Sequence, residues 1–542
     1  MPPRFRRPEP MTTFELVPDD EQDDGHGLVA PGGDDGRGAT ARLAGLRGRV
    51  TRRWRALSRR GRAAIAAGIA VVVLAATTAA VAPGLLDARD QRLRAEAVRG
   101  TPGAVGDLSE PLAETWSLAH GDGALVTLPG GTVLTTEGTE VSAIDAGTGR
   151  EVWRRDLGPS LACGPRANVW DVMSRPSAVV VCLSGEADAR TATVLDADGA
   201  VVGERSLGPA RTDGFGDAPE DGAPLVVPAA AGAVAVVDGI TDATARWPAD
   251  DQPDADTLRE LRAAGWTDPV VRVEDALTGE VRGEATLRLR PEHLEGCGMM
   301  QDEGTAPELT VEPTVSASPE VTVFSACSAA VYLTPDGATL DVDPADGWVH
   351  PLPDGGLLRV AGEESTVLDD DGSVLATVPG FLLPPTVDDD PHGSFLVLTG
   401  VGDDAAPMRL ASVGPEGEED WTATTADLGG VLARVAGTVV VQDGAGLVAF
   451  DAASGAEVWT HGDLLRRTAD GSGDWVVGAV TDGTRLLVGI NGDGAGHRLA
   501  ALDLRDGTTA WQREREGFLE GLQSVGGNVV VFDGVVRGLG QR

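Results

Sequence analysis

The sequence predicts an all-β fold: a β-propeller of about eight four-stranded blades, preceded by a disordered tail and a single transmembrane helix. Three observations lead to this prediction. A hairpin window with an aspartate, a glycine and a tryptophan recurs along the chain. Short apolar strands ending in glycine precede the window, giving about four strands in each unit of roughly 35 to 80 residues. The 542 residues include 73 Gly and 34 Pro, with few helix-forming runs after residue 100.

The recurring window reads Ala-x-Asp-x-x-x-Gly-x-x-x-Trp and indicates a β-hairpin. Apolar residues alternate before the aspartate, as in a half-buried strand. The aspartate accepts backbone N–H bonds that start a turn, and the glycine supplies the positive φ that closes it. The tryptophan then lies on a fixed face of the next strand, where we expect it to pack on the alanine of a neighbouring repeat. The windows are Ala143, Asp145, Gly149 and Trp153; Ala449, Asp451, Gly455 and Trp459; Ala501, Asp503, Gly507 and Trp511; and a partial copy with Ala411, Gly417 and Trp421.

The partial copy has Val413 where the aspartate is expected, and weaker copies elsewhere keep the turn but lack the tryptophan. The two ends of the repeat region predict closure of a ring. The last repeat, from Leu522, stops before its turn and final strand, whereas residues 113–121 resemble a final strand without partners. We therefore expect Trp116 to occupy the missing last-strand position of the C-terminal blade, which would remove both open sheet edges.

Two stretches interrupt the repeats. Residues 254–266 predict a short helix capped by Asp254 or Asp256 and ended by Gly265. The stretch from residue 291 to residue 320 predicts a long loop pinned by Cys297. Long loops on a rigid scaffold are where binding residues concentrate, so these stretches are the first places to look for function.

The chain divides into five parts. Residues 1–41 form a disordered acidic cytoplasmic tail, 42–62 an Arg-rich juxtamembrane segment, 63–86 a transmembrane helix, 87–112 a stalk and 113–542 the propeller. The stretch Ala63–Ala82 has 20 residues without a charge, which is enough to cross a bilayer core. The preceding arginines place the N-terminus in the cytoplasm and the propeller outside it. A cleaved signal peptide is the alternative, but Pro83 directly follows its small-residue site.

Charge and cysteines restrict the partners and the compartment. The net charge of −40 excludes nucleic acid as the expected partner.

All four cysteines follow the membrane segment, and an even count in an exported domain indicates two disulfides. Three pairings are open, and four free thiols are the alternative. We favour Cys163–Cys182 and Cys297–Cys327, since each pair brackets an excursion between neighbouring strands.

The window resembles the tryptophan-docking repeat of PQQ-like (quinoprotein-type) β-propellers. That family includes quinoprotein alcohol dehydrogenases and the barrel-assembly lipoprotein of Gram-negative outer membranes. The resemblance covers residues 113–542 and implies that the tryptophans lock adjacent blades together. The vicinal disulfide of the dehydrogenases is absent from this sequence, and their calcium and catalytic residues are not found by motif.

The residues therefore favour a non-catalytic, membrane-anchored, extracytoplasmic propeller that binds a protein or a cell-envelope component on one ring face. The histidines and acidic turns match no metal-ligand spacing, and no serine nucleophile motif is present, so we predict no catalytic residues, no metal and no cofactor. A PQQ-dependent quinoprotein oxidoreductase is the alternative, which a PQQ site retained in the propeller would support.

Overall fold

In the computed structural model, residues 89–541 are described, apart from residues 90–92, 120–123, 166, 169–174, 213–222, 241–242, 247–252, 301–307, 312, 341, 343–346, 353–354, 391–392, 401–407, 426–427, 445, 467–472 and 493–495. The tail 1–41, the Arg-rich segment 42–62 and the predicted transmembrane helix 63–86 lie outside the described residues. Among the residues that are described, no helix is long and apolar enough to span a membrane.

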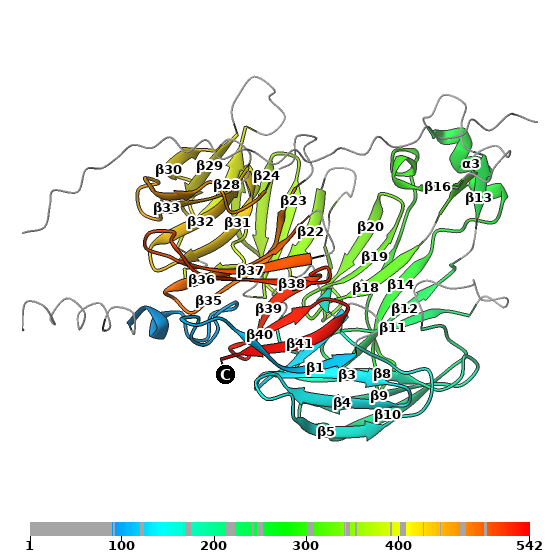
Figure 1. Cartoon of the computed structure of the whole chain (residues 1–542). Helices are drawn as coiled ribbons and strands as arrows, with labels where there is room; N and C mark the ends of the chain where they lie inside the picture. The colour runs from blue at the N-terminus through cyan, green and yellow to red at the C-terminus, as the bar shows by residue number, and fades with distance from the viewer. Residues whose placement is uncertain are drawn as a thin grey trace, which may run out of the picture. The chain divides into compact units, whose positions relative to one another are not determined.

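Residues 87–542 form one compact unit, and its described part is a β-propeller of nine blades (Figure 1). The first blade has β2 (Ala124–Leu128), β3 (Thr132–Glu137), β4 (Glu140–Asp145) and β5 (Glu151–Asp156). The second has β6 (Ala162–Gly164), β8 (Val179–Ser184), β9 (Arg190–Asp196) and β10 (Val201–Gly208). The third has β11 (Leu225–Pro228), β12 (Ala233–Asp238), β14 (Val270–Asp275) and β15 (Val281–Thr286).

The next three blades contain the region that is hardest to segment from the sequence. The fourth has β18 (Thr314–Ala317), β19 (Thr322–Ala326), β20 (Ala329–Leu333) and β21 (Thr339–Leu340). The fifth has β22 (Gly347–Pro351), β23 (Leu357–Ala361), β24 (Glu364–Leu368) and β25 (Val374–Pro379). The sixth has β26 (Phe381–Leu382), β28 (Phe395–Thr399), β29 (Arg409–Val413) and β30 (Glu419–Thr424). The expected number of about eight was one too low, because two-residue strands such as β21 and β26 leave little periodic signal.

The last three blades carry the clearest repeats. The seventh has β31 (Leu428–Val435), β32 (Thr438–Asp443), β33 (Gly446–Asp451) and β34 (Glu457–His461). The eighth has β35 (Trp475–Thr481), β36 (Arg485–Asn491), β37 (Gly496–Asp503) and β38 (Thr509–Glu516). The ninth has β39 (Gly521–Val525), β40 (Asn528–Phe532), β41 (Val535–Gly540) and, from the other end of the repeat region, β1 (Ala113–Ala119). Two short strands add to inner edges: β7 (Ala167–Asn168) to β2, and β27 (Val387–Asp388) to β31.

The core is divided among the contacts between neighbouring blades. In the described chain there are nine hydrophobic clusters, one at each of the nine blade-to-blade interfaces. The second and third strands of a blade are buried on both faces, which is why β8 (VVVCLS) and β12 (AVAVVD) are apolar almost throughout. The fourth strands are mostly exposed and carry charges, as in β5 (EVWRRD).

Ring closure is confirmed. Strand β1 pairs antiparallel with β41, and the two lie side by side in Figure 1. The ninth blade therefore takes three strands from the C-terminal end and its fourth from residues 113–119. One hydrophobic cluster joins Val133 and Ala146 of the first blade to Val530 and Phe532 of the ninth.

Strand alternation gives the ring two faces. Successive strands of a blade run in opposite directions, so the connections between first and second strands, and between third and fourth, lie on one face. We call it the AB face. The connections between second and third strands, and from the fourth strand to the next blade, lie on the opposite DA face. The Asp–Gly turns of the windows belong to the AB face.

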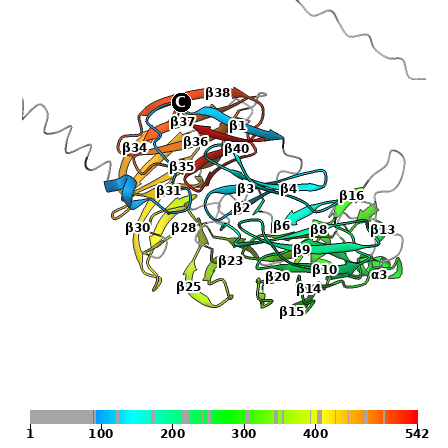
Figure 2. The same cartoon turned by 90° about the horizontal axis from the view of Figure 1, so that it is seen from below.

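The predicted excursions meet at one place on the DA face. Helix α3 (Ala255–Ala263) connects β12 to β14 and begins at its N-cap Asp254, whose carboxylate accepts from the N–H of Asp256 and Thr257. Its buried side chains pack in the cluster shared by the third and fourth blades. A three-stranded sheet lies beside it: β13 (Thr244–Arg246), β16 (Gly298–Met300) and β17 (Glu308–Thr310). Both views show α3, β13 and β16 together (Figures 1 and 2).

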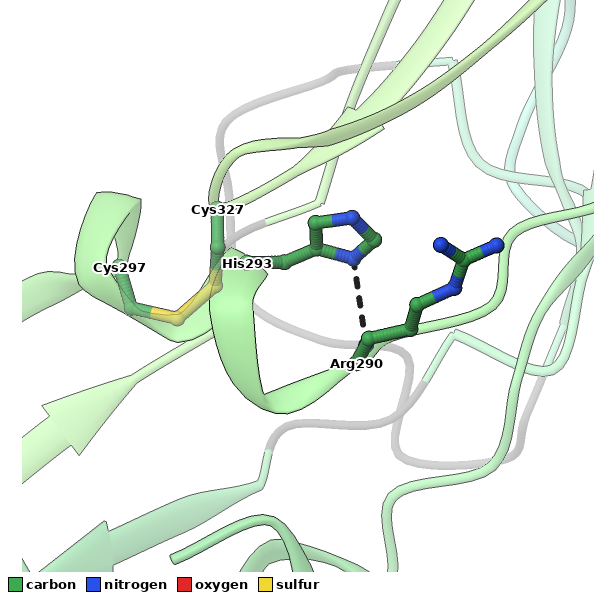
Figure 3. The surroundings of a disulfide bond; sticks show 4 residues. All are labelled: Arg290, His293, Cys297 and Cys327. Carbon is green, nitrogen blue, oxygen red and sulfur yellow. Dashed lines mark hydrogen bonds between the residues drawn. A yellow bond between two sulfur atoms is a disulfide. The ribbon is translucent and has the colours of Figure 1, made fainter. Parts of the chain in front are cut away.

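Both favoured disulfides are present. Cys163 and Cys182 are register partners on β6 and β8 and form a buried bond. Cys297 follows the 3-10 helix η1 (Pro291–Gly296) and bonds to Cys327, in the hairpin between β19 and β20. Figure 3 shows this bond at one end of η1 and, at the other, the Arg290 N–H donating to Nδ1 of the buried His293. The second disulfide thus ties the excursion to the fourth blade.

The segment assigned to a stalk, residues 87–112, is packed on the propeller over much of its length. Val98 and Leu108 are buried in the clusters of the seventh, eighth and ninth blades. The N–H of Val105 donates to the Thr481 carbonyl at 2.8 Å, and the N–H of Gly106 donates to the Gly527 carbonyl at 2.9 Å. Thr481 is the last residue of β35, next to its turn into β36, and Gly527 lies in the turn between β39 and β40, so the chain reaches the ring on its AB face.

Candidate functional site

The three complete windows are the hairpins between the third and fourth strands of the first, seventh and eighth blades, and the partial window is the hairpin of the sixth. In the first window, Asp145 Oδ1 accepts from the Thr148 N–H at 2.8 Å, and Gly149 has a φ of +67°. Ala143 lies opposite Trp153 within the same hairpin. The alanine is thus a neighbour of its own tryptophan and does not belong to the adjacent blade.

Each tryptophan reaches the turn of the next blade. The indole N–H donates to the carbonyl of the residue that follows the turn aspartate, at 2.7–3.0 Å. The pairs are Trp116 to Ala146, Trp153 to Ala197, Trp421 to Ala452, Trp459 to Leu504 and Trp511 to Leu108. For four of them, all but Trp511, the small residue under the ring is the turn glycine: a Cβ on Gly507 would lie 2.5 Å from the Trp459 ring. The expectation of alanine as the packing partner was wrong, because glycine alone leaves room for the ring.

Leu108 shows that the propeller starts before residue 113. The ninth blade has no covalent turn between its third and fourth strands, because β41 ends the chain and β1 comes from the other end. Residues 107–109 take the place of that turn. Asp107 Oδ1 accepts a hydrogen bond from the Ser109 N–H at 2.8 Å, as Asp503 Oδ1 does from the Arg505 N–H. The carbonyl of the next residue, Leu108, accepts the hydrogen bond from the indole N–H of Trp511.

In the third blade the window position of the tryptophan is taken by Gly283, and the preceding Arg282 makes a polar contact to the next blade. Arg282 donates to the carboxylate of Asp275 in its own hairpin and to the Pro335 carbonyl of the fourth blade. The hydrogen bond from Arg282, with those from the Leu277 and Thr278 backbone, outweighs partial burial and lowers the pKa of Asp275 to about 2.

We expect Asp275→Asn to lower stability at neutral pH and to reduce the acid sensitivity of the fold. A carboxylate whose folded pKa lies below its unfolded value contributes stability above the unfolded pKa, near 3.8 here. That contribution disappears as the pH falls from about 4 toward 2. Urea midpoints at neutral pH and at about pH 3 measure the effect, with Asp188→Asn in an exposed hairpin as the control. Equal pH dependence in the two variants would contradict the assignment.

A hollow lies on the AB face. A cavity of about 930 Å³ is lined by residues 95–109 and by turns of the first, eighth and ninth blades. Glycines line much of it, together with Asp107, Asp482 and Arg485. Asp482 accepts from the Leu108 N–H, so part of this polar lining already holds the incoming chain in place.

The DA face presents two aromatic pairs at blade junctions, each with an exposed tryptophan. At the first, Trp348 on β22 stacks on Phe381, with ring centroids 6.1 Å apart. At the second, Trp475 on β35 lies 5.7 Å from Phe518 at an angle of 50°. Trp348 is 49% exposed, Trp475 38% and Phe518 46%. We call these pairs the aromatic junctions. Both phenylalanines stand in the tripeptide Gly-Phe-Leu, which leads from the fourth strand of one blade into the next blade.

The backbone of each Gly-Phe-Leu segment is held by buried polar side chains. At the first junction, the Ser365 hydroxyl donates to the Gly380 carbonyl at 2.7 Å and accepts from the Leu382 N–H at 2.9 Å. Ser365 is fully buried, and Leu382 packs in the cluster between the fifth and sixth blades. Phe381 is therefore fixed between two anchored neighbours.

The second junction reaches the same arrangement with different residues. The side chain of Asn491 forms two hydrogen bonds with the backbone of Leu519. Its Nδ2 donates to the Leu519 carbonyl, and its Oδ1 accepts from the Leu519 N–H. Nδ1 of His497 lies 2.9 Å from the Gly517 carbonyl and donates to it, since a carbonyl only accepts. Burial lowers the pKa of His497, which favours the neutral form of the imidazole. Phe518 is held outward between two fixed residues.

Sequence reasoning missed both junctions. It assigned the tryptophans of the windows but left Trp348 and Trp475 unexplained, and it looked for function in the excursions. The available signal was the repeat of Gly-Phe-Leu at 380–382 and 517–519 directly after a predicted fourth strand. An exposed aromatic side chain on a fixed backbone is typical of a binding anchor, because little entropy remains to be lost when a partner docks.

Among the described residues, no three His, Cys, Asp or Glu side chains are grouped in a way that would hold a metal ion. Residues 408–541 match the family model of the outer membrane protein assembly factor BamB, a PQQ-repeat family. The sequence matched none of the curated proteins with which it was compared.

Solved propellers resemble the fold at low identity. The structure of BamB from Moraxella catarrhalis is 13% identical with a TM-score of 0.33, covering 80% of this chain and 100% of that one. A europium-containing methanol dehydrogenase is 15% identical with a TM-score of 0.29, covering 78% and 84%. Sqt1 from Saccharomyces cerevisiae is 9% identical with a TM-score of 0.34, covering 79% and 99%. Residues 408–541, which contain three of the four hairpin windows, therefore carry repeats of the PQQ-like β-propeller family.

Proposed function

We propose that this chain is a membrane-anchored, extracytoplasmic binding module whose DA face docks a partner protein through the two aromatic junctions. The observation that carries the proposal is the pair of Gly-Phe-Leu segments, each fixed by buried polar side chains and each placing its phenylalanine beside an exposed tryptophan. Exposed aromatic residues on a rigid scaffold are the residues that most often dominate the binding energy of protein interfaces.

The path of the chain supports the choice of face. Residues 104–108 run along the AB face and hydrogen-bond to its turns. A membrane anchor that precedes this segment would join the propeller on the AB side, and the DA face would stay available to a partner. The proposed localisation, a single-pass protein of the cell membrane with an external propeller, rests on the predicted helix at 63–86 and its arginine flank.

Site-specific photo-crosslinking in cells tests the proposal. A photoreactive phenylalanine analogue would replace Phe381, Phe518 or, as a control, Val202, which is exposed on the outer strand β10. We expect one partner to be crosslinked from positions 381 and 518 and not from 202. The Trp475→Ala background should reduce the yield at position 518. Equal crosslinking from all three positions would refute docking at the junctions.

A further inference from the structure

Carboxylates flank both aromatic junctions. Glu363 and Glu364 are exposed in the hairpin beside the first junction, where the Glu363 carbonyl accepts the Gly380 N–H. At the second junction, Glu516 precedes Gly517 and is exposed, and Glu520 follows Leu519 and is partly exposed. In the part of the chain that the structure describes, these four carboxylates form no ion pair. Each junction thus combines an aromatic pair with two free negative charges.

That combination suits a cation. The face of an aromatic ring carries negative electrostatic potential and attracts an ammonium or guanidinium group, more strongly for tryptophan than for phenylalanine. A carboxylate beside the ring adds charge-assisted hydrogen bonds to the same group. Arg515 is a cation of the chain itself, on the strand that leads into the second junction. Its guanidinium is half buried, and the negative charges that act on it are those of Glu114 and Asp533.

The net charge of the chain also favours a positively charged partner. The net charge is −40, and residues 1–86 contain more arginines than acidic residues, so the propeller is more acidic than the chain as a whole. Such a surface attracts a basic segment at long range and repels an acidic one. A neutral oligosaccharide would stack on the same rings but would gain nothing from this field.

Resting on the proposed function, we propose that the partner presents a basic, extended segment and that each aromatic junction receives one of its arginine or lysine side chains. The cationic group lies against the exposed face of Trp348 or Trp475, and the flanking glutamates hold its N–H groups. The two junctions lie three blades apart, so a partner that engages both is held at two points.

Fluorescence anisotropy with the full-length chain tests this chemistry. The probes are a labelled Arg-Gly repeat peptide, the matched Glu-Gly peptide and a neutral Ser-Gly peptide. We expect the Arg-Gly peptide alone to bind, with an affinity that falls as salt is raised. The Glu516→Gln/Glu520→Gln variant and Trp475→Ala should each weaken binding about tenfold, a loss of 1.4 kcal/mol.

A matched charge control separates local recognition from general attraction. Glu186→Gln/Asp188→Asn removes two exposed carboxylates from the same face, in a hairpin of the second blade that has no aromatic pair in the described chain. We expect this variant to bind the Arg-Gly peptide as the unmodified chain does. An equal loss in both double variants, or equal binding of the Ser-Gly peptide or of a neutral oligosaccharide, would overturn the proposal. Crosslinking of a partner at positions 381 and 518 without Arg-Gly binding would leave docking intact and refute the cationic chemistry.

Discussion

Trp459→Ala should destabilise the propeller by about 3–5 kcal/mol, the usual loss for a buried tryptophan. The ring is 8% exposed and packs in the cluster between the seventh and eighth blades. Its indole N–H donates to the Leu504 carbonyl at 3.0 Å, so the substitution removes packing and leaves a buried carbonyl without its donor. Denaturant unfolding of the variant and the unmodified chain measures the difference.

Trp475→Ala is the matched control, since Trp475 is a tryptophan of the neighbouring blade that is exposed on the DA face. We expect it to change stability by less than about 1 kcal/mol. Gly507→Ala changes the residue on which the Trp459 ring packs and should also destabilise the fold. The new Cβ would lie 2.5 Å from the Trp459 ring, and the φ of +70° at this position disfavours alanine. If Trp459→Ala melts at the same temperature as the unmodified chain, the docking role of the window tryptophans is wrong.

Removing β1 should open the ring. A variant that begins at residue 121 lacks the fourth strand of the ninth blade and the Trp116 contact to the first blade. The hydrogen-bonding edge of β41 is then unpaired, and such edges associate with other chains. We expect a lower melting temperature and dimers or larger species in size-exclusion chromatography with light scattering.

Two truncations serve as controls for closure. A variant that begins at residue 88 keeps β1 and the segment packed on the AB face, and it should remain as stable as the full-length chain. A variant that begins at residue 111 keeps β1 but loses Asp107 and Leu108, so Trp511 loses its acceptor. We expect intermediate stability for it. If the chain that begins at residue 121 stays monomeric and equally stable, β1 does not close the ring.

The repeat units were predictable because their chemistry is local. An aspartate that accepts N–H groups within three residues, as Asp145 does from Thr148, and a glycine with positive φ, such as Gly149, fix a turn without help from the rest of the fold. The predicted disulfides and the Asp254 cap of α3 also depend on residues that are near one another in the sequence.

The predictions that differed from the structure concern contacts between units. The sequence shows that Trp153 follows Gly149, but the ring lies over Gly199 of the next blade. The start of the propeller was placed at residue 113, yet Asp107 and Leu108 complete a turn whose other half is at the C-terminus. No pattern within one window identifies a partner that lies about 400 residues away.

The sequence by itself determined the β-propeller class and the hairpin windows, because both depend on periodicity and turn chemistry within a short stretch. It also favoured the disulfide pairing that is present and indicated that residues 113–119 supply the strand missing from the last repeat. The tertiary structure decided the number of blades, the glycine beneath four of the docked tryptophans and the docked path of residues 104–109. It also decided that Trp348 meets Phe381 and that Trp475 meets Phe518. Those pairs form only when first strands of adjacent blades stand side by side, and the ring alone imposes that arrangement.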